Sequence, residues 1–357
     1  MKILAVAGSS GGHIYPAMSL LSAVRNRIES AQTLLVVPRR SISRTIIPDT
    51  AMVEYICTTQ LSLKPSFRNL IAGFVYLKGV AQSLELILRF RPDVVIGFGS
   101  IDSIPLVMFA WLFRIHTVIH EQNVVPGRAN SFLARFADRI AVSFSRTETL
   151  FDVNPAKIIF TGNPVRPDLV KLDKKKALEF FGLSDNRLTI LAMGGSQGSS
   201  RINKYFSEAV RNIKDVQVIH ISGANDCYRL EEYYKKAQIE ARVIPFCRDM
   251  HYAYSASDMA VCRAGATTIA ELSYFALPAV IIPYPFAYDH QIENARLLEG
   301  AGAAEVIRDC DLESGVLEEE VRKCSQRKFL DHMRVNYGGY DRPAAAELLA
   351  DLVSNVK

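Results

Sequence analysis

The sequence has no Cys-x-x-Cys pair and no apolar run long enough to cross a membrane. Its six cysteines are scattered through 357 residues. A chain of this length does not need disulfide bonds, so we expect reduced thiols in a reducing compartment. A spanning helix needs about 20 consecutive apolar residues. Residues 70–90 come nearest, but polar side chains interrupt them at Lys78, Gln82, Glu85 and Arg89.

A strong charge imbalance and a secretion signal are missing as well. The formal net charge of +5 is too small to indicate a nucleic-acid partner. It suits phosphate-bearing ligands or an anionic membrane surface, although an uneven scatter of surface charge explains it equally well. The apolar residues 3–7 are too few for a signal peptide and are better interpreted as a first strand. We therefore expect a cytoplasmic protein.

What the sequence does contain is a repeated alternation of short β-branched runs with helix-spaced segments. Strands are expected at residues 3–7, 33–37, 94–96, 117–119, 139–142, 189–193, 216–221, 241–244, 259–261 and 279–282. This alternation is typical of βαβ units and predicts an α/β protein with parallel sheets covered on both faces by helices. A hydrophobic content of 49% is enough for two separate cores.

The alternation begins again at Gly194, where a strand runs into a glycine-rich turn and a helix, as it does at Gly8. Two such beginnings predict two doubly wound domains. A glycine and two prolines interrupt regular structure between them. We expect domains at residues 1–162 and 163–340, followed at 341–357 by an amphipathic helix with Pro343 in its first turn.

The first glycine-rich turn reads GSSGGH at residues 8–13. Backbone N–H groups and a helix N-terminus at such a turn can bind phosphate or another polar ligand, and paired glycines permit close approach. His13, whose ordinary pKa lies near 6.5, can act as a base there at cytoplasmic pH. A tight turn with a helix-capping histidine is the alternative without a ligand.

Nicotinamide-cofactor enzymes share this strand–turn–helix arrangement. Here the turn reads GxxGG rather than GxGxxG, and the second strand ends without an acidic residue for a ribose hydroxyl. Arg39 and Arg40 follow instead, which would suit NADP. An NADP-dependent oxidoreductase is therefore an alternative function.

Two further turns lie in the second half. GGSQGS at residues 194–199 forms an anion-binding concavity around Ser196, able to hold a diphosphate without a tightly bound metal. CRAGATTIAE at 262–271 places Glu271 on the same side of a helix as Thr267 and Thr268. This carboxylate can accept both hydroxyls of a ribose, or act as a capping-box acid for Thr268.

Polar side chains at other strand ends extend the candidate site. HEQN at residues 120–123 is costly to bury without partners, which favours a site, with a satisfied structural network as the alternative. Gln291 follows a loop shaped by two prolines and can bond sugar hydroxyls, or simply face solvent. Arg166, near the predicted domain boundary, can reach a phosphate.

Six strings occur in a fixed order between residues 8 and 294: GSSGGH, HEQN, GNPVR, GGSQGS, CRAGATTIAE and DHQIENA. In this order and spacing the sequence resembles the MurG family. The resemblance implies the GT-B fold, with two Rossmann-like domains, a cleft between them and a last helix that crosses back to the first domain. It implies inverting transfer of GlcNAc from UDP-GlcNAc to the 4-hydroxyl of MurNAc in undecaprenyl-pyrophosphoryl-MurNAc-pentapeptide (lipid I), giving lipid II for peptidoglycan synthesis, cell shape and cell division.

The resemblance also implies roles for individual residues. His13 would be the catalytic base, with Glu121 as its rival. The diphosphate would meet Arg166 and Ser196, uracil would meet Cys247, ribose Glu271 and GlcNAc Gln291. The full set of donor-binding residues would be Ser10, Gly11, Gly12, Asn123, Arg166, Ser196, Cys247, Ala266, Thr267, Thr268, Ile269, Ala270, Glu271 and Gln291.

The sequence departs from the family in two places. The family commonly has GGTGGH in the first turn, and here Ser9 and Ser10 replace glycine and threonine. The family's GGYxSGP-like segment, which faces the acceptor, corresponds here to residues 97–105 with an altered register. Another GT-B enzyme, with a different acceptor or acting as a UDP-GlcNAc 2-epimerase, is therefore a second alternative.

Metal and membrane complete the expectations. Asp309 and Asp311 have the DxD form of metal-dependent glycosyltransferases, but Asp311 is more simply a cap for a helix beginning at Leu312. We expect no tightly bound cofactor or metal, with divalent cations at most stimulating activity. The acceptor lipid implies a peripheral protein at the cytoplasmic face of the membrane, and residues 61–78 suit such contact. A helix packed on the sheet is the alternative.

Overall fold

The computed structural model describes residues 1–39, 47, 52–58, 67–166, 168–195, 198–285, 290–339 and 344–355, without the side chains of 67–71, 338 and 339. The chain divides into two compact units. Unit 1 comprises Met1–Arg166 and Pro343–Lys357, and unit 2 comprises Pro167–Arg342. The chain therefore leaves unit 1 after Arg166 and returns to it near Pro343.

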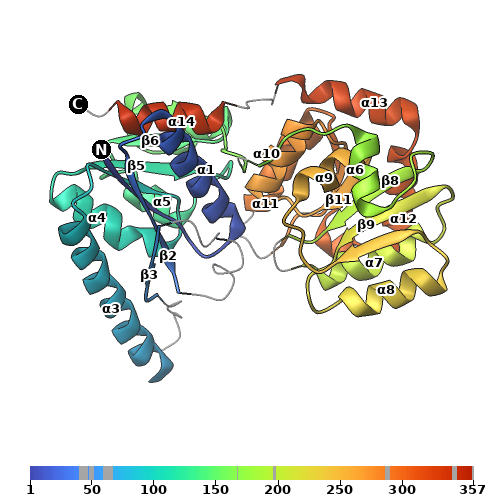
Figure 1. Cartoon of the computed structure of the whole chain (residues 1–357), viewed down its shortest axis with the longest axis horizontal. Helices are drawn as coiled ribbons and strands as arrows, with labels where there is room; N and C mark the ends of the chain where they lie inside the picture. Colours follow the sequence, from blue (N-terminus) through green and yellow to red (C-terminus); the bar gives the residue numbers. More distant parts are fainter. Residues whose placement is uncertain are drawn as a thin grey trace. The chain divides into compact units, whose positions relative to one another are not determined.

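Unit 1 is built on a seven-stranded, fully parallel sheet in the order β3-β2-β1-β4-β5-β6-β7 (Figure 1). All five strands predicted for this half are present, and two more form its edges. The strands are β1 (Lys2–Val6), β2 (Gln32–Pro38), β3 (Val53–Ile56), β4 (Val94–Gly97), β5 (His116–Glu121), β6 (Arg139–Val142) and β7 (Ile158–Phe160).

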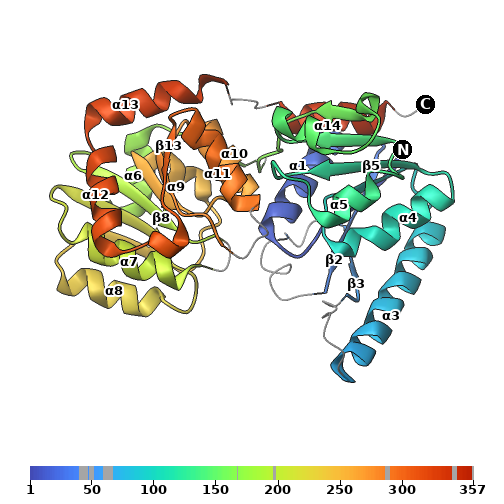
Figure 2. The same cartoon turned by 180° about the vertical axis from the view of Figure 1, so that it is seen from behind.

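Helices cover both faces of this sheet because alternate strand residues point to opposite sides. Ile3 and Ala5 enter one apolar core, whereas Leu4 and Val6 enter the other. Figures 1 and 2 show α1 and α14 on one face and α4 and α5 on the other. The helices are α1 (Gly11–Arg27), α3 (Phe67–Phe90), α4 (Ile104–Leu112), α5 (Arg128–Leu133) and α14 (Ala345–Ser354), with short 3-10 helices η1 (Ile101–Ser103), η2 (Ser145–Leu150) and η3 (Pro155–Lys157).

Helix α14 belongs to unit 1 although it follows unit 2 in the chain. Leu349, Ala350 and Val353 pack into the core that α1 also lines. Arg27 near the end of α1 forms an ion pair with Asp351. The helix begins at Ala345, and Pro343, which was expected in its first turn, lies outside the described residues.

Unit 2 has a six-stranded parallel sheet in the order β10-β9-β8-β11-β12-β13. The five predicted strands are present, and β13 is added at one edge. The strands are β8 (Leu188–Met193), β9 (Val216–Ile221), β10 (Ala241–Ile244), β11 (Met259–Cys262), β12 (Ala279–Ile281) and β13 (Ala304–Val306). The helices are α6 (Lys174–Phe181), α7 (Ser200–Val210), α8 (Cys227–Lys236), α9 (Met250–Ala256), α10 (Ala266–Phe275), α11 (His290–Gly300), α12 (Ser314–Cys324) and α13 (Arg327–Val335), with η4 (Asp309–Asp311) and η5 (Asn336–Gly339).

In each sheet the strand order reverses once, beside the first strand of the unit. The reversal lies between β1 and β4 in unit 1 and between β8 and β11 in unit 2. Ligands of open α/β sheets bind at the carboxyl ends of the strands beside such a reversal. Among the described residues, no helix is both long and apolar enough to cross a membrane.

Candidate functional site

The turn after β1 holds His13 at the third position of α1. Ser10 is the N-cap, and its carbonyl accepts the backbone N–H groups of His13 and Ile14 at 3.0 and 3.1 Å. The hydroxyl of Ser10 lies 3.2 Å from Nδ1 of His13. A Cβ added to Gly8 would lie 2.6 Å from that nitrogen, so glycine is required beneath the imidazole.

The imidazole of His13 is held neutral by its surroundings. Burial lowers the pKa of His13 to about 4, against an opposing effect of the Asp102 carboxylate. This value lies well below the pKa of an unperturbed histidine, near 6.5. At neutral pH the ring has a lone pair available to accept a proton.

The turn after β4 approaches His13 from the neighbouring strand. Nε2 of His13 lies 3.6 Å from the Cβ position of Gly99. The next residue, Ser100, has φ 69° and ψ 151°, a region normally restricted to glycine. Its hydroxyl donates to Oδ2 of Asp102 at 2.8 Å. This is the segment where the sequence departs from the family pattern.

Glu121 at the end of β5 binds its own loop. Oε1 accepts N–H groups from the backbone and side chain of Asn123 at 2.9 and 3.2 Å. Oε2 accepts the backbone N–H of Gly127 at 3.0 Å and the side-chain amide of Asn130 at 2.8 Å. The carboxylate is buried and accepts four hydrogen bonds, which fix the loop that carries Asn123.

The neighbouring residues of the HEQN string form a satisfied network. Nε2 of His120 lies 3.2 Å from the carbonyl of Gly162, and Nδ1 lies 3.0 Å from Nε2 of Gln122. Burial lowers the pKa of His120 to about 4. The structural alternative for these two residues is therefore realised, while Gln122 Oε1 still comes within 3.7 Å of the Cβ position of Gly99.

Arg166 lies near the end of the first long segment of unit 1. Its guanidinium carbon is 4.5 Å from the centroid of the Tyr15 ring. Tyr15 belongs to the same helix as His13, so Arg166 is tied to the α1 turn. The hydroxyl of Ser19 on this helix donates to the carbonyl of Val165 at 2.7 Å.

In unit 2, the turn after β8 depends on its glycines. A Cβ on Gly194 would lie 2.2 Å from the backbone nitrogen of Ser199, and one on Gly198 would lie 2.4 Å from the carbonyl oxygen of Ser222. Gly195 and Gly198 also have positive φ. Ser196, the predicted diphosphate residue, lies outside the described residues.

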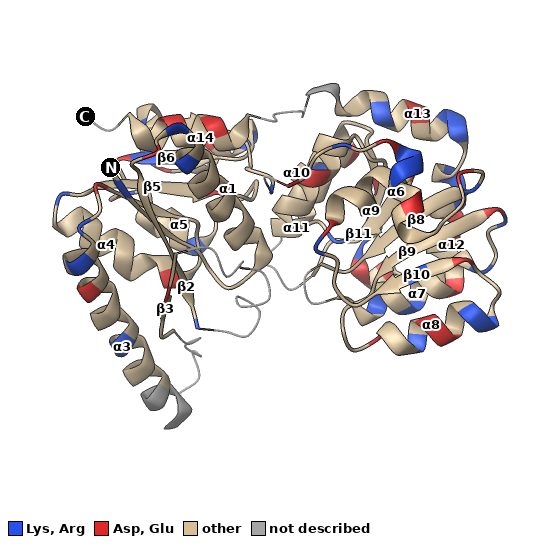
Figure 3. Ribbon diagram, in the orientation of Figure 1, with Lys and Arg blue, Asp and Glu red and all other residues tan. Residues whose placement is uncertain are grey.

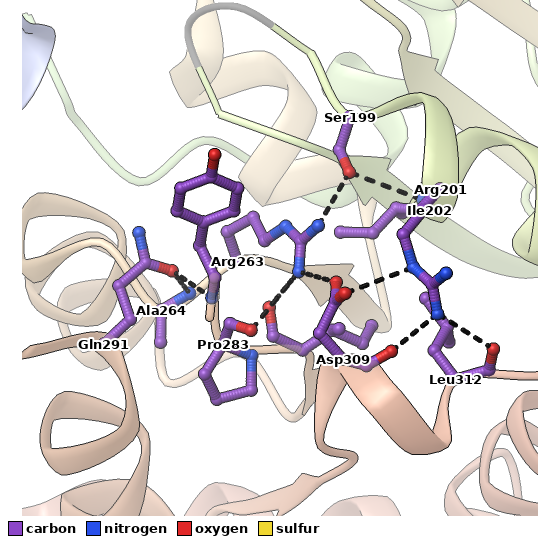
Figure 4. Close-up of polar contacts among 11 residues, drawn as sticks. Ser199, Arg201, Ile202, Arg263, Ala264, Pro283, Gln291, Asp309 and Leu312 are labelled. Atoms are coloured by element: carbon purple, nitrogen blue, oxygen red, sulfur yellow. Dashed lines mark hydrogen bonds and ion pairs between the residues drawn. The ribbon is translucent and has the colours of Figure 1, made fainter. Parts of the chain in front are cut away.

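Arg263, directly after β11, joins several loops at the carboxyl edge of the sheet (Figure 4). Nη2 donates to the hydroxyl of Ser199 at 3.0 Å. Nη1 donates to the carbonyls of Ile282 and Pro283 at 3.1 and 3.3 Å and to Oδ1 of Asp309 at 2.6 Å. A single buried guanidinium therefore connects the ends of β8, β11, β12 and β13.

Gln291 in α11 links two of the same loops. Its Oε1 accepts the backbone N–H of Ala264 at 3.1 Å and that of Tyr284 at 2.9 Å (Figure 4). The alternative of an ordinary solvent-facing residue was therefore wrong. A proposed sugar contact would have to use the other end of the amide.

Helix α10 presents the remaining predicted donor residues. Its N-cap is Gly265, so Ala266, Thr267, Thr268, Ile269 and Ala270 form its first residues. Glu271 comes sixth, which excludes the capping-box role, since that role requires the third position. The buried carboxylate of Glu271 accepts a hydrogen bond from the hydroxyl of Tyr254, with 2.6 Å between the two oxygens. Cys247 is buried in the segment between β10 and α9.

The DxD segment forms ion pairs. Asp309 contacts Arg263 and lies 3.1 Å from Nε of Arg201, while Asp311 pairs with Arg308. Helix α12 begins only at Ser314, so the expected cap by Asp311 at Leu312 was wrong. Within the described part of the chain, no group of three or more His, Cys, Asp or Glu side chains comes together as a metal site.

Sequence reasoning did not single out four residues of this arrangement: Ser100, Asp102, Tyr254 and Asp309 as a partner of Arg263. Arg263 itself was inside a recognised string but had no role. A charged residue placed directly after a buried strand was the available signal for Arg263. The signal for Asp102 was weaker: it is an acidic residue in the segment where the sequence departs from the family pattern.

Two parallel, doubly wound units, each with a glycine-lined turn at its strand-order reversal, define the GT-B class of glycosyltransferases. Comparison with known families identifies the family within this class. The N-terminal domain of glycosyltransferase family 28 matches residues 3–142, and its C-terminal domain matches residues 189–336. The chain belongs to this family, which favours a glycosyltransferase over an oxidoreductase.

Relatives and solved structures match the whole chain. A UDP-N-acetylglucosamine--N-acetylmuramyl-(pentapeptide) pyrophosphoryl-undecaprenol N-acetylglucosamine transferase from Halalkalibacterium halodurans is 35% identical, covering 100% of this chain and 99% of the relative. The crystal structure of Acinetobacter baumannii MurG matches with a TM-score of 0.78 at 26% identity, covering 99% of both chains. The UDP-GlcNAc 2-epimerase from Neisseria meningitidis matches with a TM-score of 0.70 at 13% identity, covering 99% of this chain and 100% of the epimerase, which indicates a shared fold only.

Proposed function

We propose that the chain transfers GlcNAc from UDP-GlcNAc to the 4-hydroxyl of MurNAc in lipid I, forming lipid II for peptidoglycan synthesis. The observation that carries the proposal is similarity along the full length to relatives named for this transfer. The loops at the strand ends of each unit support the proposal, because the transfer requires binding sites for both a donor and an acceptor.

The donor is assigned to unit 2. The turn 194–199 and the N-terminus of α10 supply backbone N–H groups and a positive dipole for the diphosphate. Glu271 accepts the ribose hydroxyls, with Tyr254 holding its carboxylate by the 2.6 Å hydrogen bond. Gln291 is held by Ala264 and Tyr284 through its oxygen, which leaves its NH2 group to donate to GlcNAc.

His13 acts as the base. The bond between the anomeric carbon and the β-phosphate oxygen breaks as the acceptor oxygen bonds to that carbon from the opposite side, with inversion. The acceptor proton moves to His13, and UDP leaves. If Nδ1 of His13 carries the ring proton and donates to Ser10, Nε2 is left with the lone pair that accepts this proton.

Glu121 is proposed as a positioning residue rather than the base. Its two oxygens already accept four N–H groups from the loop 121–130. Taking a proton from the acceptor would require it to give up at least one of them. The carboxylate instead fixes the loop that carries Asn123, a proposed donor-binding residue.

The reaction is proposed to need no tightly bound metal. Asp309, the first acid of the DxD segment, is engaged by Arg263 and Arg201, and main-chain N–H groups with Arg166 would balance the diphosphate charge. Activity should survive exhaustive treatment with a chelator, with at most partial stimulation by added divalent cations. Complete loss that manganese restores would contradict this.

Contact with the membrane surface is assigned to α3. Phe74, Leu77 and Lys78 are exposed on this helix, with 74% and 63% of the Phe74 and Leu77 surfaces open to solvent. Few charged residues interrupt α3 (Figure 3). Apolar side chains beside a lysine suit a helix lying on an anionic lipid surface. Residues 61–66 of the predicted segment lie outside the described residues.

The decisive test is mass-spectrometric detection of lipid II after incubation with lipid I and UDP-GlcNAc. A 2-epimerase would consume UDP-GlcNAc without acceptor and give its C2 epimer, so a reaction lacking lipid I separates the two functions. Thermal shifts with UDP, UDP-GlcNAc and NADPH test the donor class, since a ligand raises the apparent stability of the protein that binds it. Stabilisation by NADPH alone would refute the proposal.

A further inference from the structure

The backbone at Ser100 is strained, because a serine occupies a conformation that glycine would adopt more easily. A non-glycine residue in this region of φ and ψ is strained and persists only where the surroundings impose it. The carbonyl of Ser100 accepts the hydroxyl of Ser103 at 2.8 Å, and the hydroxyl of Ser100 donates to Asp102. The chain therefore keeps a hydroxyl at a position where glycine would be easier to accommodate.

This hydroxyl group and the proposed base both lie close to Gly8. A point at the Cβ position of Gly8 is 2.6 Å from Nδ1 of His13, 2.7 Å from Cβ of Ser100 and 3.1 Å from its Oγ. The imidazole of His13 and the side chain of Ser100 therefore both lie beside Gly8. Ser10 contacts the imidazole from its own turn, at 3.2 Å from Nδ1.

Asp102 is the third residue of this arrangement, and one of its carboxylate oxygens makes no hydrogen bond within the described part of the chain. Its side chain is 2% exposed, Oδ2 accepts from Ser100, and Oδ1 is buried with no hydrogen-bond partner among the described residues. A buried carboxylate oxygen without a donor costs stability. An interaction with a charge formed during the reaction would offset this cost.

We infer that Asp102, oriented by the hydroxyl of Ser100, is a positioning residue that supports the positive charge formed on His13 when the acceptor proton arrives. The inference rests on the proposed role of His13 as the base. Asp102 touches neither donor nor acceptor in this scheme. It acts by placing a negative charge near the imidazole inside a poorly hydrated site, where such an interaction is strong.

Several titratable groups surround this pair. Asp102 comes from η1 and Tyr76 from α3. Burial, and to a lesser extent the charge of Asp102, raises the pKa of Tyr76. His120 and Glu121 come from β5, and the ring of His120 packs on Phe98 with centroids 5.4 Å apart. Asp102 is the carboxylate that raises the pKa of His13 against the effect of burial.

The test uses three variants of the full-length protein. Asp102→Asn removes the charge and keeps the shape, Ser100→Ala removes the hydroxyl, and Ser100→Gly removes both the hydroxyl and the strain. Asp152→Asn is the control, because it removes one negative charge from an exposed position in the same unit. Each is assayed for lipid II formation across pH and for UDP binding by thermal shift.

We expect Asp102→Asn to lower kcat by roughly 10–100-fold, a part of the 10²–10⁴-fold that a general base contributes. The KM for UDP-GlcNAc should stay within about twofold, because removing an interaction made only in the transition state changes kcat alone. The acid limb of the pH–rate profile should move to lower pH. Ser100→Ala should show a smaller loss, and Ser100→Gly should raise Tm while still lowering kcat.

A readout independent of turnover separates this inference from the proposed function. Nitrogen chemical shifts of labelled His13, assigned by their absence in His13→Gln, follow the protonation of its ring as the pH is lowered from 7. We expect protonation of the ring to move to lower pH in Asp102→Asn and to stay unchanged in Asp152→Asn, because Asp102 raises the pKa of His13 against the larger effect of burial. Unchanged protonation of His13 in Asp102→Asn, or an unchanged kcat, would overturn the inference even if lipid II is formed. Absence of lipid II in the wild type would overturn the proposed function instead.

Discussion

Oδ1 of Asp309 lies 2.6 Å from Nη1 of Arg263, and these side chains are only 11% and 9% exposed. Breaking a buried ion pair by removing one partner costs about 3–5 kcal/mol, because the remaining charge is left uncompensated. Asp309 keeps Arg201 as a partner at 3.1 Å, so Arg263→Met should lower the free energy of unfolding by less than this, by about 2–3 kcal/mol. It should also raise the KM for UDP-GlcNAc, since Ser199 and Pro283 lose their shared donor.

Urea unfolding and steady-state kinetics measure both effects. Arg308→Met is the matched control, because Arg308 pairs with Asp311 at the surface and its side chain is 75% exposed. A surface pair contributes about 0–1 kcal/mol. If the two variants lost equal stability, the buried pair would not hold the loops of unit 2 together.

The two candidate bases can be separated by their effects on rate and on stability. His13→Gln should lower kcat by roughly 10²–10⁴-fold and leave UDP binding intact. Glu121→Gln should mainly destabilise unit 1, by about 1–3 kcal/mol, because an NH2 group would face donors that the carboxylate now accepts. A variant of Glu121 that folds normally and loses all turnover would restore it as the base.

The pH dependence of the reaction follows from the same histidine. The pKa of His13 in the folded protein is about 4, so the ring is neutral above that pH. We expect a rate that changes little from pH 6 to 8 and falls as the pH approaches about 4. A rate that falls through pH 6.5 would indicate that the base keeps an ordinary pKa.

Stability at acid pH should depend on His220, a buried residue of β9. Nε2 lies 3.0 Å from Oδ1 of Asn203 and Nδ1 lies 2.8 Å from the hydroxyl of Tyr234. Burial lowers the pKa of His220 from 6.5 to about 3. The unfolded chain binds the proton first, so the stability contributed by neutral His220 is complete above pH 6.5 and is lost as the pH falls toward about 3.

Replacing this histidine should therefore flatten the dependence. Between pH 7 and pH 5 the wild type should lose about 2 kcal/mol more than His220→Gln does. Urea unfolding at the two pH values measures the difference. The exposed His332 provides the control, and His332→Gln should behave as the wild type does. Parallel losses in wild type and His220→Gln would contradict the prediction.

Membrane binding provides a further prediction. The double substitution Phe74→Ser with Leu77→Ser should lower sedimentation with anionic liposomes by about tenfold or more, since each buried large apolar side chain contributes about 1.5–3 kcal/mol. Turnover of a short-chain, water-soluble acceptor should not change. The control Tyr228→Ser with Val335→Ser removes two residues of unit 2 that are at least equally exposed. Unchanged sedimentation of the α3 variant would remove this helix from consideration.

The sequence predicted the interior of both sheets and the edge strand β10, and it missed the other three edge strands, β3, β7 and β13. Central strands are mostly continuous apolar runs, as in Ile3–Val6 of β1 and Met259–Cys262 of β11, because helices cover both faces. By contrast, β3 and β7 have mostly half-buried residues, and β13 has only three residues. Short, partly exposed strands carry too little periodicity to be distinguished from loops.

The candidate site was predictable where the chemistry is local. Glycine turns and the spacing of Glu271 from Thr267 can be read within ten residues of sequence. The pairing of Arg263 with Asp309 cannot, because 46 residues separate the two. The positive φ of Ser100 could not be predicted either, because a serine in a sequence does not indicate this conformation. The depressed pKa of His13 required its burial to be known.

Helix α14 has a consequence for the order in which the protein folds. Its apolar residues complete the core beside α1, yet all of unit 2 is synthesised before them. A nascent chain therefore has every part of unit 2 available while α1 still exposes an uncovered apolar face. We expect unit 2 to mature first during translation, and the incomplete first unit to be the species most dependent on chaperones.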